Sequence, residues 1–300
     1  MTWHGRDTIA LIELIFYSPF LLLSAFVCFR HGFSRSSGWF YTLVLCLIRI
    51  IGGICQFVSH SDQSTGLLKT ILILDSVGLA PLLLATLGLL SRFVDFVNAN
   101  STPQFTIRHF RLLQLLLLVA TILAIAGGSN ASVDSKGTYQ IPTTSKIGVI
   151  LYIVGFVGIA VVFVLSLPHT SVIPNKERRV PIAIGLALLF IIVRLIYSIL
   201  SVFIHDRLFS VATGSAAIRL GMAVVEEIMV VGIYVLLGLF VDKLDASING
   251  PIASRPWSAK NRSRRRQAGP TTIVDPEAQH LNDYPAPPSN PYPQTHGIER

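Results

Sequence analysis

Long apolar runs separated by short polar segments dominate this sequence. A helix that crosses the hydrocarbon core of a bilayer needs about 20 consecutive, mostly apolar residues. Seven runs are long enough, at about residues 8–29, 39–58, 67–90, 110–127, 147–167, 181–203 and 217–241. The pattern therefore predicts an all-α, polytopic membrane protein whose residues 1–245 form a bundle of seven transmembrane helices.

The last part of the chain, residues 246–300, has a different composition. The apolar runs end there, and Pro, Ser, Asn and Gln become frequent, as in the stretch PAPPSNPYPQ. Such a composition cannot bury a core, so we expect a disordered, basic, proline-rich tail. The tail also contains a cluster of basic residues, Arg262, Arg264, Arg265 and Arg266. This cluster is a candidate for binding anionic lipid headgroups. Alternatively, it only fixes the orientation of the last span.

Composition and charge support the membrane interpretation and add an orientation. The chain is 52% apolar and only 13% charged, against about 25% charged residues in a typical soluble domain. Most of its 24 Lys and Arg residues fall in the tail and in every second connection, and basic segments stay in the cytoplasm. We therefore expect the N-terminus outside, the tail in the cytoplasm and no nucleic-acid partner. Asn130 begins a glycosylation sequon in a connection predicted to lie outside.

The second and sixth runs resemble each other. Three polar pairs recur at an offset of 145 residues: Arg49 with Arg194, Gln56 with Ser201 and His60 with His205. In each run these positions return to one face of a helix. The third and seventh runs match more loosely at an offset of 150 residues. The chain thus has the pattern of two parallel three-span units joined by the fourth span, a 3+1+3 arrangement like the parallel repeats of some transporters.

Charged residues inside the runs are the candidate site, because an Arg or Asp in mid-span costs about 2.5–3.5 kcal/mol and is expected to face inward and pair. The primary candidates for binding a ligand or ion are Glu13, Arg49, Asp75, Arg194, Glu226 and Glu227. The secondary candidates are Tyr17, Gln56, His60, Ser201 and His205. We expect the two mid-run arginines to pair with Asp75, Glu226 or Glu227. Lys69 and Arg219 lie near the ends of their runs and are expected to reach the surface.

Two interpretations of this polar layer stay open. In the first, the ion pairs only hold helices together, with small residues allowing close contact. In the second, the layer lines a polar cavity that binds an ion, a proton or a small polar molecule. The adjacent acids Glu226 and Glu227 favour the second interpretation, since ionisable groups in membranes often mark such sites.

Three segments resemble a fungal family of seven-pass membrane proteins known only as a domain of unknown function: IFYSPFLLLSAFVCFRHGFSRSSGWFYTLVLCLIRIIGG, the region from Asp75 to Pro81, and the paired acids of the last run. The resemblance covers about residues 8–245. It implies the span count and the membrane location, but no substrate and no catalytic residue. The chain is also similar in outline to the seven-pass fungal lipid-translocating exporter-like proteins.

Motifs of several functional classes are missing from the sequence. It has no zinc-protease motif, no phosphate-binding glycine loop and no nucleophile elbow, so we expect no enzyme, no metal and no cofactor. We expect a protein that handles a small polar or amphipathic solute, or a proton. The alternatives are a receptor or sensor that signals through its tail, and a structural scaffold of the membrane.

Overall fold

The computed structural model describes residues 5–31, 37–59, 61, 64–100, 105–130, 132–133, 139–140, 142–172, 178–204, 215–241 and 252. Over these ranges the chain forms seven helices that are long and apolar enough to cross a membrane, which confirms the all-α bundle. The small exception is an antiparallel pair of two-residue strands, β1 (Ser132–Val133) and β2 (Tyr139–Gln140). His60, His205 and the arginine cluster of the tail lie outside the described residues.

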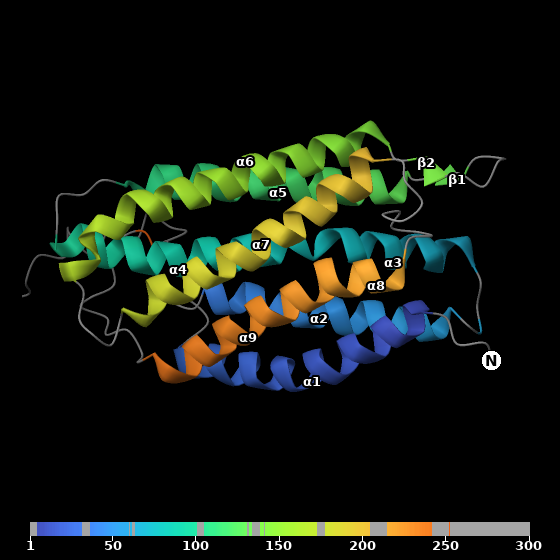
Figure 1. Cartoon of the computed structure of the whole chain (residues 1–300), viewed down its shortest axis with the longest axis horizontal. Coiled ribbons are helices and arrows are strands. Elements are labelled where there is room, and N and C mark those ends of the chain that lie inside the picture. Colours follow the sequence, from blue (N-terminus) through green and yellow to red (C-terminus); the bar gives the residue numbers. More distant parts are fainter. Residues whose placement is uncertain are drawn as a thin grey trace, which may run out of the picture. The chain divides into compact units, whose positions relative to one another are not determined.

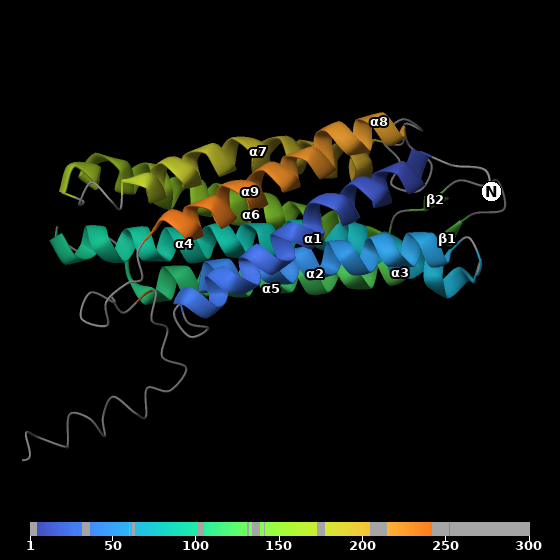
Figure 2. The same ribbon diagram turned by 90° about the horizontal axis from the view of Figure 1, so that it is seen from below.

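The seven spans run in alternating directions along the chain (Figure 1). They are α1 (Gly5–His31), α2 (Ser37–Val58), α3 (Thr65–Val77) with α4 (Leu79–Asn100), α5 (Ile107–Ser129), α6 (Thr143–Ser166), α7 (Arg179–Phe203), and α8 (Ala216–Arg219) with η2 (Leu220–Val224) and α9 (Val225–Phe240). A short 3-10 helix, η1 (Leu167–Val172), follows α6. The start of α1, the strand pair, α3 and α8 share one end of the bundle (Figures 1 and 2).

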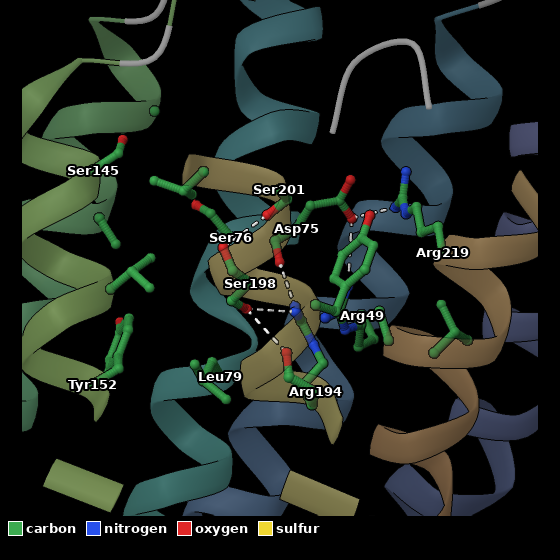
Figure 3. Close-up of a pocket in the computed structure, with 17 residues that line it drawn as sticks. Arg49, Asp75, Ser76, Leu79, Ser145, Tyr152, Arg194, Ser198, Ser201 and Arg219 are labelled. Carbon is green, nitrogen blue, oxygen red and sulfur yellow. Dashed lines mark hydrogen bonds and ion pairs between the residues drawn. The ribbon is translucent and has the colours of Figure 1, made fainter. Parts of the chain in front are cut away.

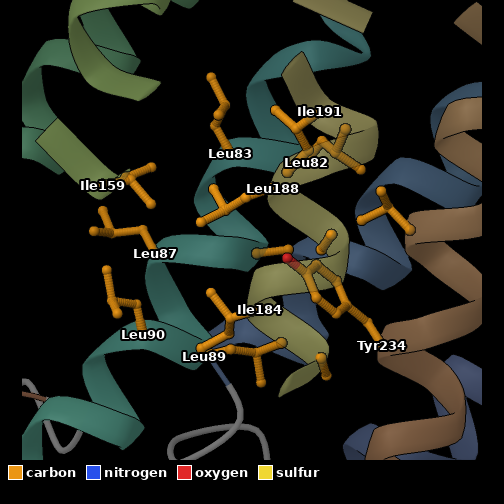
Figure 4. Packing of buried hydrophobic residues seen from close by; sticks show 14 of the residues in the cluster. Leu82, Leu83, Leu87, Leu89, Leu90, Ile159, Ile184, Leu188, Ile191 and Tyr234 are labelled. Carbon is orange, nitrogen blue, oxygen red and sulfur yellow. The ribbon is translucent and has the colours of Figure 1, made fainter. Parts of the chain in front are cut away.

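Helix α4 is the centre of the bundle. It contacts α2, α5, α6 and α7, and nearly every residue from Leu79 to Val97 is buried. A helix that is apolar all round is expected to be enclosed by others. Its leucines pack into a layer of aliphatic side chains and one tyrosine (Figure 4): Leu82, Leu83, Leu87, Leu89, Leu90, Ile159, Ile184, Leu188, Ile191 and Tyr234.

The outer helices expose large apolar side chains. Leu22 and Phe29 of α1 are 72% and 74% exposed, and Leu112, Leu189 and Phe240 are similarly open. Monomeric soluble proteins rarely expose contiguous apolar patches of more than a few hundred Å². This surface fits contact with lipid, and with the seven apolar helices it supports a multi-pass membrane protein.

The third span extends further than the apolar pattern predicts. Its helix continues to Asn100, past the expected end at residue 90. Arg92 and Asp95, expected in or near a connection, are therefore buried inside the bundle. The guanidinium of Arg92 lies 5.7 Å from the ring centre of Trp39, and a carboxylate oxygen of Asp95 accepts a hydrogen bond of 3.1 Å from the backbone N–H of Ile252.

The third span is also interrupted at Gly78, where α3 ends and α4 begins. Pro81 explains the position of this break. Proline has no backbone N–H, so it cannot donate to the carbonyl four residues earlier, which belongs to Val77. The break divides the span into a shorter, partly exposed α3 and a longer, buried α4.

The seventh span contains a second irregularity. Between α8 and α9 the segment η2 is a π-helix. Backbone hydrogen bonds in a π-helix join residues five apart instead of four, so the segment changes the direction in which the side chains before it point relative to those after it. Short π segments in α-helices occur frequently at functional sites.

Candidate functional site

A fully buried carboxylate, Glu227 on α9, joins three helices. Arg49 of α2 donates to it from Nε and from Nη2, each at 2.6 Å. Arg194 of α7 donates from Nε to the Oε1 oxygen of Glu227 at 2.8 Å. Bidentate arginine–carboxylate pairs are among the stronger hydrogen-bonded contacts in proteins. The predicted ion pairs of the two mid-span arginines thus converge on one acid.

A second carboxylate, Asp75, lies on α3 close to the break in the third span. Arg219 Nη2 donates to its Oδ1 oxygen at 2.5 Å, and Arg49 Nη1 lies 3.4 Å from the same oxygen. Arg49 Nη1 is also 3.5 Å from Glu13 Oε1 on α1. Three arginines and three acids therefore form one network, called here the charge cluster: Glu13, Arg49, Asp75, Arg194, Arg219 and Glu227.

The break in the third span helps to build the charge cluster. Arg194 Nη2 donates to the backbone carbonyl of Asp75 at 3.4 Å. The last carbonyls of a helix have no partner within the helix, and here the neighbouring α7 supplies one for Asp75, near the end of α3. Gly78 leaves the room for this arrangement, because a Cβ atom there would lie 3.1 Å from Glu227 Oε1 and would overlap the guanidinium of Arg49.

A cavity of about 100 Å³, called here the large cavity, borders the charge cluster (Figure 3). It has room for several water molecules or a small solute, since one water needs about 10–15 Å³ on this measure. Its charged lining is Arg49, Asp75, Arg194 and Arg219. Six hydroxyl groups and seven other residues complete it: Ser76, Ser145, Tyr152, Tyr197, Ser198 and Ser201, with Leu79, Ala124, Gly128, Val149, Val202, Ala223 and Val224.

A second, small cavity of about 10 Å³ is lined by α1, α2, α3 and α8. Its lining includes Arg6, Glu13 and Gln56, and Gln56 donates to Asp7 Oδ1 at 3.2 Å. The volume suits about one water molecule. Asp75 and Arg219 line both cavities, so their ion pair lies between the two spaces.

Five of the six primary candidates lie in the charge cluster, and Glu226 does not. In the described part of the chain Glu226 forms no ion pair, and its Oε2 atom is buried without a hydrogen-bond partner. Among the secondary candidates, Ser201 lines the large cavity and Gln56 the small one. Tyr17 is fully buried, and its hydroxyl has no partner within the described ranges.

The prediction that Arg219 reaches the surface is wrong. Its side chain is largely buried and binds Asp75. The π-helix that follows Arg219 changes its direction relative to α9, which regular helical spacing does not anticipate. Arg6, which lines the small cavity, was also missed. Its spacing of seven residues from Glu13 places both on one helix face, and this spacing is a signal that could have found it.

The described residues contain no group of three or more His, Cys, Asp and Glu side chains placed to hold a metal ion. The large cavity offers guanidinium N–H groups, one carboxylate and several hydroxyls. Charged hydrogen bonds are stronger in a water-poor interior than in water. The arrangement is therefore suited to binding a small molecule through its polar groups.

The sequence profile of a family described as "Domain of unknown function (DUF7702)" matches residues 3–244. The chain belongs to this family. The DUF7702 match includes the whole charge cluster and both cavities and ends before the tail. It supports the resemblance to an uncharacterised domain, whereas the fungal origin stays a prediction and the seven spans depend on the structure. Among curated proteins and among solved structures, none matches this chain.

Proposed function

We propose that this protein is a membrane carrier that binds a small polar or amphipathic solute in the large cavity and moves it without changing it chemically. The observation that carries this proposal is the large cavity itself, which joins Arg49, Asp75 and Arg194 inside an apolar bundle. Polar space at this position is costly in a membrane, so an occupant that uses its hydrogen-bonding groups accounts for it.

The two interrupted spans also support a carrier. Irregular backbone inside a bilayer is tolerated where it is enclosed by protein or lines a cavity. Substrate sites of many secondary transporters are formed by discontinuous helices. Here Asp75, near the break of the third span, meets Arg219, next to the π segment of the seventh span. A network that only held helices together would not need a cavity beside it.

A blocked cavity tests the proposal. Val149 of α6 lines the large cavity and is 8% exposed, whereas Val154 of the same helix does not line it and is 50% exposed. Val149→Phe should fill the cavity, and Val154→Phe should leave it open. Both variants and the unchanged protein would be purified and reconstituted into lipid vesicles.

Flux across these vesicles would then be measured for radiolabelled short-chain carboxylates, amino acids and polyols, and for protons with an internal pH-sensitive dye. We expect flux of at least one probe in the unchanged protein, retained in Val154→Phe and lost in Val149→Phe. Equal flux in the two variants, or flux of no probe in any protein, contradicts the proposal.

A further inference from the structure

The charge cluster is neutral as a whole, but the side that faces the large cavity is not. Arg49, Arg194 and Arg219 all line this cavity, and Asp75 is the one acid among its lining residues in the described part of the chain. Glu227 is fully buried and does not line the cavity. Glu13 lines the small cavity instead. An occupant of the large cavity therefore meets more positive than negative groups.

Three of the four serine hydroxyls that line the cavity use their protons within the protein. Ser76, Ser198 and Ser201 donate to backbone carbonyls of their own helices, at 2.8, 3.2 and 3.0 Å. Their protons are thus directed away from an occupant. The guanidinium groups, with five N–H donors each, are the main donors that remain.

Arg219 has the most donors free for an occupant. Among the described residues its side chain makes one hydrogen bond, to Asp75, whereas Arg194 uses Nε, Nη1 and Nη2 for Glu227, Ser198 and the carbonyl of Asp75. A guanidinium with free N–H groups suits an oxygen acid, because two of its donors can meet two acceptor oxygens.

The other side of the large cavity is mainly apolar. Ala124 and Gly128 of α5 and Val149 of α6 form it, with Ser145 and Tyr152 at its edges. In Figure 3, Ser145 and Tyr152 lie across the cavity from Arg194 and Arg219. An apolar surface of this kind suits a short hydrocarbon body.

We propose that the occupant is a small organic anion, with its acidic group bound by Arg219 and Arg194 and its apolar part against α5 and α6. This inference depends on the proposed function and narrows it to one class of solute. A carboxylate with a short alkyl chain fits both sides of the cavity. Inorganic phosphate shares the acidic oxygens but lacks the apolar part.

The test compares four probes that differ in charge or in apolar body: butyrate, butyramide, butylammonium and inorganic phosphate. Binding to the purified protein in detergent would be measured by calorimetry and by the shift of the melting temperature. We expect butyrate to bind more tightly than the other three. Arg219→Gln should weaken butyrate binding roughly tenfold or more, because it removes charged hydrogen bonds.

Control variants separate binding from folding. Lys69 is exposed on α3 and lines neither cavity, so Lys69→Gln should bind butyrate as the unchanged protein does. Arg219→Lys keeps the charge, and its butyrate affinity should lie between those of Arg219→Gln and the unchanged protein. If Lys69→Gln lost as much butyrate affinity as Arg219→Gln, the proposed role of Arg219 in binding would be wrong.

The possible results distinguish this inference from the carrier proposal. If butyramide or butylammonium binds best and Val149→Phe removes that binding, the cavity is a solute site but the anion inference is wrong. If phosphate binds and butyrate does not, the apolar part of the inference is wrong. If none of the four binds while vesicle flux of an amino acid, a polyol or protons still depends on Val149, the carrier proposal remains and the anion inference is rejected.

Discussion

Helices α3 and α4 are two halves of one span, yet they serve the bundle in different ways. Helix α4 is enclosed by its neighbours, and its buried hydroxyl at Thr86 lies 2.7 Å from that of Tyr234. Helix α3 is partly exposed, and its Asp75 lies between two cavities. A segment that packs the core and a segment that contributes Asp75 to the site are thus consecutive, with Gly78 between them. Substitutions on either side should therefore have different effects.

The largest effect is expected at Glu227, whose carboxylate lies beside Gly78, the boundary between the two segments. Glu227→Gln leaves the guanidinium groups of Arg49 and Arg194 without their common carboxylate, and breaking a buried ion pair costs about 3–5 kcal/mol. Unfolding in a denaturing detergent would measure the loss. The neighbouring Glu226→Gln is the control and should change stability little, and equal stability of the two variants would contradict the assigned network.

Next in size is a cavity made in the core of α4. Leu83 is fully buried, and Leu83→Ala should lower the free energy of unfolding by about 2–5 kcal/mol. Solute binding per folded molecule should be unchanged, because Leu83 lines neither cavity. Leu112→Ala, at a lipid-facing position that is 65% exposed, should cost far less. If Leu83→Ala lost solute binding but kept its stability, the assignment of α4 to the core and α3 to the site would be wrong.

A smaller effect is expected at the boundary, in Gly78→Ala. The new Cβ atom would displace Arg49 and Glu227, and such overpacking typically costs about 1–3 kcal/mol. The same unfolding measurement would detect it, together with weaker solute binding. Gly66→Ala on α3 is the matched control, since no atom lies within 4 Å of its added Cβ. If the two variants behave alike, close packing at the break is not required.

The smallest effect is expected from the polar contact inside the apolar region. Tyr234→Phe removes the hydroxyl that meets Thr86, at a cost of about 0.5–1.5 kcal/mol. A double-mutant cycle with Thr86→Val would isolate this contact, because coupled residues give less than the sum of their separate effects. Strict additivity of the two substitutions would show that the hydrogen bond contributes nothing.

The fold was largely predictable from the sequence. Length and apolarity determine which segments can span a bilayer, and the seven runs became seven long apolar helices. The charge cluster was predictable for a related reason: Arg49 and Arg194 are costly in mid-span unless they find acids. The rule predicts that the two arginines pair with buried acids, but it does not say which acid.

Other parts of the site could not be predicted, because they depend on irregular backbone or on contacts distant in sequence. Regular helical spacing cannot anticipate the π segment, and so Arg219 was expected at the surface. Which of Glu226 and Glu227 pairs with the two arginines depends on how α9 is rotated about its axis relative to α2 and α7. Arg92 and Asp95 were counted outside the span, although Trp39 and Ile252 give them partners inside the bundle.

Glu227 lies on the last of the seven spans, so it is synthesised after both of the arginines that it binds. Arg49 is synthesised 178 residues before its main partner, and Arg194 33 residues before it. While the earlier spans enter the membrane, Glu227 does not yet exist. Glu13 is synthesised before Arg49 and lies 3.5 Å from it in the folded protein. It can therefore pair with Arg49 before Glu227 has been synthesised. Completion of the seventh helix is therefore the step that brings both arginines their shared carboxylate.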